Sequence, residues 1–301
     1  MIVLTTPTGQ IGSQVLEHVL RGGEPVRVIA RNPDALPSET IARVEVVTGS
    51  HGDPEVVDKA FEGADSVFWL CPPDSHAPSA EVAYVGFTRP AAAAIGRHKV
   101  ARVVGISALG RGTPIAEHAG LVTASLAMDD LLASTSASYC AVTNPSFMDN
   151  LLRQVEAIRS QGAFFLPVDG DLKQPAAASR DIAAAAAGLL LDPSWSGDRE
   201  LPVMGPEDLS FNEMAAVMTD VLDRPVRFER TPDDAYNARL LSFGMSEAMA
   251  QATLDMWTAY DDGLTLAEPR TAASTTPTSF RQWCEDTLKP AIERADARAS
   301  Q

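Results

Sequence analysis

The chain of 301 residues is long enough for two domains of ordinary size, or for one domain with an appended lobe. Its 45% hydrophobic and 21% charged residues are typical of a globular protein and exclude a disordered or fibrous chain. With 24 basic and 40 acidic side chains, the formal net charge is −16, which disfavours nucleic acid and anionic membrane surfaces as partners.

The cysteines and the amino terminus indicate a reducing compartment. Cys71, Cys140 and Cys284 lie far apart, with neither a disulfide framework nor the spacing of metal ligands. Met1 leads directly into a short apolar stretch without the pattern of a secretion signal, and no apolar run reaches the length of a membrane span. We therefore expect a cytoplasmic protein without a bound metal; its oligomeric state stays open.

The first half alternates short apolar runs with segments of helical periodicity. The apolar runs are 2–4, 26–30, 44–47, 67–70, 103–106 and 140–142, and the helical segments are 13–21, 54–61, 88–97 and 125–134. Runs that are apolar on both faces are typical of buried parallel strands. Their alternation with helices predicts βαβ units and a doubly wound α/β sheet with helices on both faces.

After Pro145 the alternation becomes irregular. We expect helices at 151–160, 181–191, 210–222, 245–260 and 280–292, strands at 164–168, 201–204 and 226–228, and a loop at 268–278. Asp181 is expected to cap the Ala-rich helix, and the tail after Ala295 to be frayed. Ser210 and Glu213 form a capping-box pattern. The helix that follows has one apolar face, made by Phe211, Met214, Ala215, Met218 and Val221.

The strongest local signal lies between Leu4 and Val15. A buried strand ends near Leu4, Gly9 permits a tight turn, and Gly12 allows a pyrophosphate to approach the amino end of the next helix. The Gly-x-x-Gly spacing alone is a weak match to a dinucleotide fingerprint. Its place between the first strand and the first helix favours a phosphate loop over an ordinary glycine turn.

Arg31 stands at the end of the second expected strand, where a side chain selects the ribose of the cofactor. A guanidinium suits bidentate contact with a 2′-phosphate, whereas an acidic side chain would accept hydrogen bonds from a 2′-hydroxyl. Arg31 followed by Asn32 therefore predicts NADP(H) rather than NAD(H). The alternative is that Arg31 is a solvated surface charge.

Eight segments in collinear order carry a family resemblance. They are Thr-x-x-Gly-Gln-Ile-Gly at 6–12, Ala-Arg-Asn-Pro at 30–33, Ser-Val-Phe-Trp-Leu at 66–70, Val-Val-Gly-Ile-Ser at 103–107, Asn-Pro-Ser-Phe-Met-Asp-Asn at 144–150, and the stretches 179–184, 205–210 and 277–280. Together they resemble the NmrA-like branch of the atypical short-chain dehydrogenase/reductases, and above all its quinone oxidoreductases. The resemblance covers most of the chain.

The resemblance implies a Rossmann-type NADP(H)-binding domain over 1–150 and a smaller α/β substrate-binding lobe over 151–301, from which some segments return to the main sheet. It implies a phosphate loop at Thr6, Thr8, Gly9, Gln10, Ile11 and Gly12, and a 2′-phosphate contact at Arg31. It also implies a strand end on the adenosine side at Leu70, Cys71 and Pro72, and one on the nicotinamide side at Ser107 and Ala108. The loop over the nicotinamide is implied at Asn144, Pro145, Ser146 and Phe147. Two positions depart from the family: Ser50 replaces an Asp after the third strand, and Thr143 replaces an Arg before the Asn-Pro turn.

The usual proton donor of short-chain reductases is missing. In those enzymes a Tyr donates the proton and a Lys four residues later lowers its pKa, but none of the four tyrosines has Lys at that spacing. Three explanations stay open. The acceptor is a quinone or an enone that needs little acid help; His118 donates instead, with Ser107 orienting the carbonyl; or the protein is a redox sensor that binds NADP(H) without turnover and acts through a protein partner.

We therefore expect an NADPH-dependent reductase of a carbonyl, quinone or conjugated small molecule, with the sensor as the alternative. The apolar residues of 147–148, 164–166 and 245–260 predict a pocket for an apolar or aromatic substrate, although core packing explains the last of these segments as well. His118 is also compatible with an ordinary loop histidine. The pair Asp129 and Asp130 is expected to be a solvated helix end, not a pair of acid/base groups.

Overall fold

A computed structural model describes residues 1–299 of the chain, which form two compact units. Unit 1 consists of Met1–Ala108, Val122–Thr143 and Ile182–Pro202. Unit 2 consists of Leu109–Leu121, Asn144–Asp181 and the chain from Val203 onward. The two units are thus interleaved along the sequence.

Unit 1 is built on one seven-stranded sheet with the strand order β10-β6-β5-β4-β1-β2-β3. Its strands are β1 (Ile2–Leu4), β2 (Val26–Ala30), β3 (Glu45–Thr48), β4 (Ser66–Trp69), β5 (Arg102–Ala108), β6 (Ser138–Asn144) and β10 (Arg199–Pro202). The pairs β1/β2, β2/β3, β1/β4, β4/β5 and β6/β10 are parallel. This order is that of a Rossmann sheet, whose direction of winding reverses between β1 and β4. The predicted fold class is confirmed.

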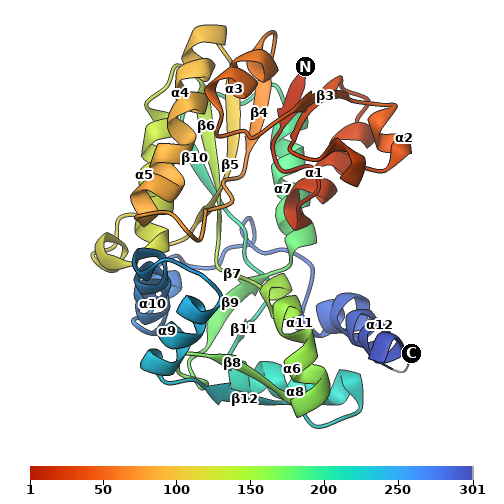
Figure 1. The fold of residues 1–301 in the computed structure, drawn as a ribbon, viewed down its shortest axis with the longest axis vertical. Helices are drawn as coiled ribbons and strands as arrows, with labels where there is room; N and C mark the ends of the chain where they lie inside the picture. Colours follow the sequence, from red (N-terminus) through yellow and green to blue (C-terminus); the bar gives the residue numbers. More distant parts are fainter. Residues whose placement is uncertain (300–301) are drawn as a thin grey trace. The chain divides into compact units, whose positions relative to one another are not determined.

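Helices cover this sheet on both faces (Figure 1). They are α1 (Gln10–Arg21), α2 (Ser38–Ile41), α3 (Pro54–Phe61), α4 (Phe87–His98), α5 (Leu121–Ala133) and α7 (Ser179–Leu191). A single buried core contains Phe61 of α3, Ile95 of α4 and Met128 of α5 together with strand residues such as Trp69, so these three helices share one face. On the other face α1 meets α7, since a β-carbon on Gly22 would collide with Leu191.

Unit 2 contains two small sheets and six α-helices among its described residues. One sheet has the order β11-β9-β7 and the other pairs β12 with β8. The strands are β7 (Ser146–Phe147), β8 (Ala163–Leu166), β9 (Gln174–Ala177), β11 (Asp208–Leu209) and β12 (Arg227–Arg230). The α-helices are α6 (Val155–Gln161), α8 (Phe211–Leu222), α9 (Asp233–Ser242), α10 (Glu247–Asp261), α11 (Phe280–Trp283) and α12 (Lys289–Ala299). None of the helices within residues 1–299 is long and apolar enough to cross a bilayer.

The predicted start of α8 is confirmed by its hydrogen bonds. The hydroxyl of Ser210 accepts from the backbone N–H of Glu213 at 3.1 Å, and the Glu213 carboxylate accepts from the backbone N–H of Ser210 at 3.0 Å. All five residues of the expected apolar face are buried. This local pattern decides the helix because it supplies both the cap and the face that packs.

The expected cap of α7 is wrong. The helix begins at Ser179, so Asp181 lies in its first turn, where its carboxylate accepts from the backbone N–H and the hydroxyl of Thr278 at 3.1 and 2.9 Å. The backbone N–H of Ser179 donates instead to the carboxylate of Asp149 at 2.7 Å. A residue thirty positions earlier thus satisfies the helix start, which local sequence reasoning does not detect.

Three further helices differ from expectation. The segment predicted as one helix at 151–160 is a 3-10 helix (Met148–Gln154) followed by α6. Helix α9 was not predicted because it buries no residue and so has no apolar stripe. The last helix does not fray after residue 295 but continues to Ala299, where Asp296 pairs with Arg159 at 3.5 Å and with Arg224 at 3.7 Å.

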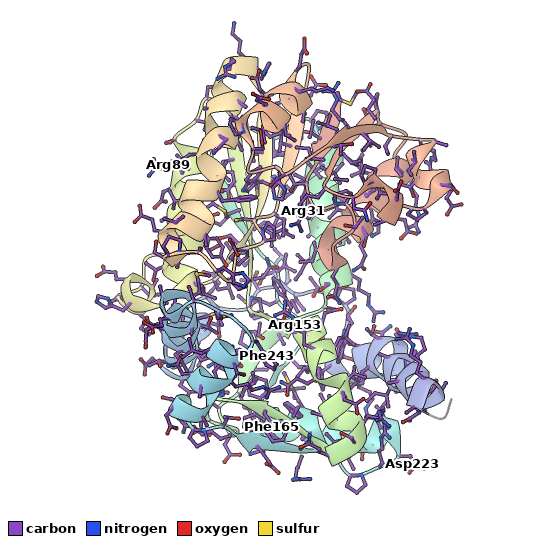
Figure 2. The ribbon with its side chains drawn as sticks, in the orientation of Figure 1. Arg31, Arg89, Arg153, Phe165, Asp223 and Phe243 are labelled. Carbon is purple, nitrogen blue, oxygen red and sulfur yellow. The ribbon has the colours of Figure 1, made fainter. Side chains whose placement is uncertain are left out.

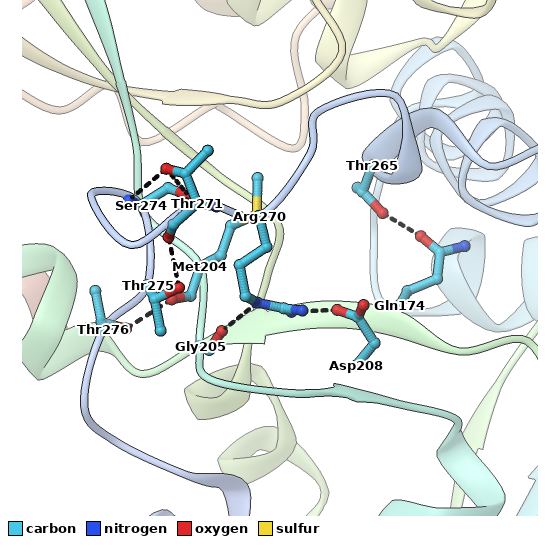
Figure 3. Close-up of polar contacts among 10 residues, drawn as sticks. All are labelled: Gln174, Met204, Gly205, Asp208, Thr265, Arg270, Thr271, Ser274, Thr275 and Thr276. Atoms are coloured by element: carbon cyan, nitrogen blue, oxygen red, sulfur yellow. Dashed lines mark hydrogen bonds and ion pairs between the residues drawn. The ribbon is translucent and has the colours of Figure 1, made fainter.

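The predicted loop at 268–278 is irregular but held in place by hydrogen bonds (Figure 3). The guanidinium of Arg270 donates to the backbone oxygen of Gly205 at 2.8 Å and pairs with Asp208. The backbone N–H of Thr276 donates to the oxygen of Met204 at 2.7 Å. These contacts satisfy the polar groups that a loop would otherwise leave without partners.

Candidate nucleotide-binding site

The loop between β1 and α1 is tied to the neighbouring strand. The hydroxyl of Thr5 donates to the backbone oxygen of Phe68 at 3.1 Å and accepts from the backbone N–H of Leu70 at 3.0 Å. The next residue, Thr6, has a positive φ of 52°, an uncommon conformation for a β-branched residue. Strained backbone of this kind clusters at ligand sites.

Gly12 is needed because the first turn of α1 packs against Thr6. A β-carbon on Gly12 would overlap the backbone oxygen of Thr6 and would lie 2.8 Å from its hydroxyl. Gly9 precedes the helix without a capping side chain, and the first turn of α1, which is fully described, carries no acidic residue. The amides of a first turn have no partner within the helix, so this end suits an anion.

The side chains of the loop divide into those that are available to a ligand and those that pack in the core. Thr6 Oγ1 is buried and has no hydrogen-bond partner among residues 1–299, whereas Thr8 and Gln10 are exposed. Ile11 is buried in the core, so only its backbone is available to a ligand. A buried hydroxyl without a partner is costly, and a phosphate oxygen beside it would remove that cost.

Arg31, which is labelled in Figure 2, follows the last residue of β2 and is exposed. The nearby His51 is buried, and its Nε2 lies 3.1 Å from the backbone oxygen of Leu70. Burial, which is the largest effect, and the Arg31 charge together lower the pKa of His51 from 6.5 to about 4, against the opposing effect of the hydrogen bond with the Leu70 carbonyl. His51 is therefore neutral at physiological pH, and the positive charge at this place comes from Arg31.

His51 lies beside the predicted adenosine-side strand end, and the sequence analysis did not single it out. Its ring packs edge-on against Trp69 at 5.1 Å and against Phe87 at 4.8 Å between ring centroids. The signal in the sequence was its place directly after Ser50, at the end of the third strand. Gly52 belongs to the same arrangement, since the Phe87 ring occupies the space of a side chain there.

The strand end after β4 holds the predicted adenosine-side residues. Leu70 is half-buried and Pro72 is exposed. Cys71 is buried, its thiol donates to the backbone oxygen of Ala83 at 3.3 Å, and burial raises its pKa to about 12. At neutral pH this thiol is protonated and hence a poor nucleophile.

Ser107 lies next to last in β5, followed by the half-buried Ala108. The Ser107 hydroxyl donates to the carboxylate of Asp129, which also accepts from the hydroxyl of Tyr139 at 2.5 Å. The expectation that Asp129 and Asp130 form a solvated helix end is wrong for Asp129, which is 1% exposed, and holds for Asp130, which is exposed. Asp129 lies on the face of α5 that packs on the sheet.

The remaining predicted residues belong to unit 2. His118 is exposed at the end of the 3-10 helix Ile115–His118. Asn144 is buried at the end of β6, and its backbone oxygen accepts from Leu109 at 3.1 Å. Pro145 is buried, while Ser146 and Phe147 form β7 and are half-buried. The structure thus brings the residues of the phosphate loop, Arg31, Leu70 and Ser107 to one edge of one sheet, and assigns His118 and 144–147 to the other unit.

Part of the predicted substrate pocket is core. Met148, Phe164 and Tyr260 are almost completely buried in one hydrophobic cluster of unit 2, so their apolar surface is used in packing. Phe165, labelled in Figure 2, and Leu166 keep part of their surface accessible. Core packing therefore accounts for most of the Met and aromatic residues.

Comparison with known proteins decides the family. A family profile described as NAD(P)H-binding matches residues 7–193, more than half of the chain. The chain belongs to this NAD(P)H-binding family. A (4-alkanoyl-5-oxo-2,5-dihydrofuran-3-yl)methyl phosphate reductase of Streptomyces griseus is 31% identical over 80% of this chain and 81% of its own. An NAD(P)H azoreductase of Xenophilus azovorans is 27% identical over 85% of this chain and 86% of its own.

The fold has solved counterparts. The crystal structure of an NADPH-dependent quinone oxidoreductase from Escherichia coli, complexed with NADPH, superposes with a TM-score of 0.73 at 22% identity, and covers 98% of this chain and 100% of its own. The predicted resemblance is confirmed at the level of family and fold. The matches also bear out the predicted class, an NAD(P)H-dependent oxidoreductase, and its nicotinamide nucleotide cofactor.

Proposed function

We propose that this protein is an NADPH-dependent reductase of an apolar, conjugated acceptor such as a quinone, with the nucleotide bound at the carboxyl edge of the unit 1 sheet. The observation that carries the proposal is the loop at Thr6. Its buried hydroxyl has no partner among residues 1–299, and it packs so closely on Gly12 that no side chain fits there. The residues fit a dinucleotide, because the first turn of α1 offers amides to a pyrophosphate without a competing acidic group.

Different residues at the carboxyl edge of the unit 1 sheet bind different parts of NADPH. The loop of Thr6, Thr8 and the residues 9–12 binds the pyrophosphate, and Arg31 binds the 2′-phosphate. The strand ends at 70–72 and 107–108 border the nucleotide. NADPH supplies the hydride when bound; the protein contributes orientation and exclusion of water.

A conjugated acceptor is favoured because the protein lacks the usual proton donor. Tyr139, the tyrosine that packs against β5, is buried, and its hydroxyl donates to Asp129. A quinone needs little acid help, since the charge that develops on it is delocalised. The relatives named as an azoreductase and as a reductase of an oxo-dihydrofuran derivative support reduction as the direction of the reaction.

We also propose different roles for the two units. Unit 1 carries every predicted contact to the phosphates, and we assign nucleotide binding to it. The apolar residues of unit 2 that keep accessible surface, such as Phe147 and Phe165, are suited to an aromatic substrate. The substrate lobe accordingly lies in residues 151–301 apart from Ile182–Pro202, which belong to unit 1, with 144–147 at its start.

The test combines the purified protein with NADPH and a panel of quinones, enones and simple ketones, and follows the loss of nicotinamide absorbance. We expect turnover with quinones or enones and little with simple ketones. Tight NADPH binding with no oxidation across the panel would instead support the redox sensor. No binding of either nicotinamide nucleotide would reject the proposal as a whole.

A further inference from the structure

Three buried side chains from three elements form one polar network in unit 1. Ser107 comes from β5, Asp129 from α5 and Tyr139 from β6, and they are 6%, 1% and 3% exposed. The Asp129 carboxylate accepts through Oδ2 from Ser107 and through Oδ1 from Tyr139 at 2.5 Å. A carboxylate this deeply buried is costly unless it accepts hydrogen bonds, so the two hydroxyls stabilise it.

The strand β5 is shaped to admit this network. A β-carbon on Gly105 would overlap the Tyr139 hydroxyl and would lie 2.9 Å from its Cζ atom, so the phenol occupies the space of a side chain. Gly105 and Ser107 face the same side of the sheet because side chains alternate along a strand. The glycine therefore lets the Tyr139 hydroxyl reach Asp129 close to Ser107.

We infer that Asp129 is a positioning residue that turns Ser107 into a hydrogen-bond acceptor for the nucleotide. A serine hydroxyl has one proton and two lone pairs, and here the proton is given to Asp129. Toward a ligand at the carboxyl end of β5, Ser107 then offers lone pairs. Its partner must carry an N–H or O–H group. This inference rests on the proposed nucleotide site.

The strand order indicates which part of the nucleotide carries that group. The pyrophosphate lies at the end of β1, and Arg31 at the end of β2 draws the adenosine half to that side. The nicotinamide half therefore extends over β4 and β5, and β5 lies two strand spacings, about 10 Å, from β1. The carboxamide of nicotinamide has an NH₂ donor, whereas the carbonyl of an acceptor has none. Ser107 thus meets a donor of the nicotinamide half and does not orient the substrate carbonyl. The ribose hydroxyls are donors too, and of the two groups we assign the carboxamide to Ser107.

The experiment compares binding of NADP⁺ with that of its 3-acetylpyridine analogue, in which a methyl group replaces the carboxamide NH₂. Calorimetric titration of the whole protein measures both affinities without turnover. We expect the wild type to prefer NADP⁺ by about five- to tenfold, the effect of one hydrogen bond. Ser107→Ala should abolish this preference.

The variants of Asp129 test whether the Ser107 hydroxyl donates its proton to residue 129 or to the ligand. In Asp129→Asn the amide can donate to Ser107, which turns the serine proton toward the ligand, so the preference should disappear or favour the analogue. Asp129→Glu keeps an acceptor and should retain the preference. Asp130→Asn removes the same charge from the adjacent exposed residue and should change nothing.

The outcomes separate this inference from the nucleotide site itself. Equal affinity of the wild type for both ligands, or an unchanged preference in Ser107→Ala, overturns the role of Ser107. An unchanged preference in folded Asp129→Asn overturns the role of Asp129. If Asp129→Asn does not fold, Asp129→Glu is the test. Loss of the preference for NADP⁺ in Asp129→Glu overturns the role of Asp129, and retention of the preference supports that role. A wild type that binds neither ligand removes the proposed function and this inference with it.

Discussion

Gly12 and Thr6 are packed so closely that the helix and the loop could not meet if residue 12 carried a side chain. A β-carbon at Gly12 would overlap the Thr6 backbone oxygen and approach its hydroxyl to 2.8 Å. Thr6 holds a positive φ of 52°, and its hydroxyl is buried without a partner within residues 1–299. The contact fixes the amides of α1 around the place where we put the pyrophosphate.

Replacing Gly12 with Ala should therefore lower NADPH affinity by at least about tenfold and destabilise unit 1 by about 1–3 kcal/mol, since the added methyl group displaces Thr6. Calorimetric titration and thermal unfolding measure the two effects. Gly96→Ala in α4 is the control, because among residues 1–299 no atom beyond its chain neighbours and the adjacent helix backbone lies within 4 Å of the added carbon. Unchanged nucleotide affinity in Gly12→Ala would show that the loop is not the phosphate site.

Arg31→Ala should weaken NADPH binding by about 10- to 100-fold, because a charge-assisted contact to the 2′-phosphate is lost. NADH binding should change little, since NADH lacks that phosphate. Fluorescence titration with both nucleotides measures the ratio. Arg21→Ala, an exposed arginine at the far end of α1 that pairs with Glu17, controls for loss of charge. Equal losses for both nucleotides would assign Arg31 a role other than reading the 2′-phosphate.

His51 should make folding stability depend on pH. Its pKa is about 4 in the folded protein and near 6.5 when unfolded, so between these values the unfolded state binds more protons. Its contribution is complete above pH 6.5 and is lost as the pH falls toward 4, by up to about 3 kcal/mol. Urea unfolding at several pH values measures this loss.

His51→Gln keeps an N–H for the Leu70 oxygen and cannot titrate in this range. Its stability should fall less steeply between pH 6.5 and 4 than that of the wild type. Other groups titrate in both proteins, so the difference between the two slopes is the informative quantity. Parallel slopes would contradict the neutral, buried state of His51.

His118→Ala distinguishes a reaction that needs little help from an acid from one in which His118 donates the proton. We expect turnover with quinones to stay within about threefold of the wild type, whereas any turnover with simple ketones should fall by about 10²- to 10⁴-fold, the usual contribution of a general acid. Since His118 is exposed, stability should be unaffected. His76→Ala replaces another exposed histidine as the control. Full turnover with every acceptor would remove His118 from the candidate acids.

Local patterns predicted elements of the fold and the candidate residues of the nucleotide site. The residues of α3 were predicted with their bounds from apolar residues at helical spacing, and in the structure the carboxylate of Asp53 accepts from the N–H groups of Glu55 and Val56 at the helix start. The glycines of the loop and Arg31 at a strand end follow equally from short spacings along the chain. Such features are decided within a few residues, so composition and periodicity reveal them.

The network of Ser107, Asp129 and Tyr139 could not be predicted from local sequence patterns. A search for Lys four residues after a Tyr dismissed Tyr139, and two adjacent acids suggested a solvated helix end. The tertiary structure decided otherwise, because Gly105 admits the phenol and α5 turns Asp129 toward the sheet.

The sequence by itself determined the parallel sheet, and it predicted the phosphate loop and the charge that we place beside the ribose, since each depends on the chemistry of neighbouring residues. Only the tertiary structure decided which carboxylate is buried, which distant residue satisfies the start of α7, and that His51 lies against Trp69 and Phe87. The physical reason is that burial and hydrogen-bond partners depend on contacts between segments far apart in the chain, and these leave no periodic trace in the sequence.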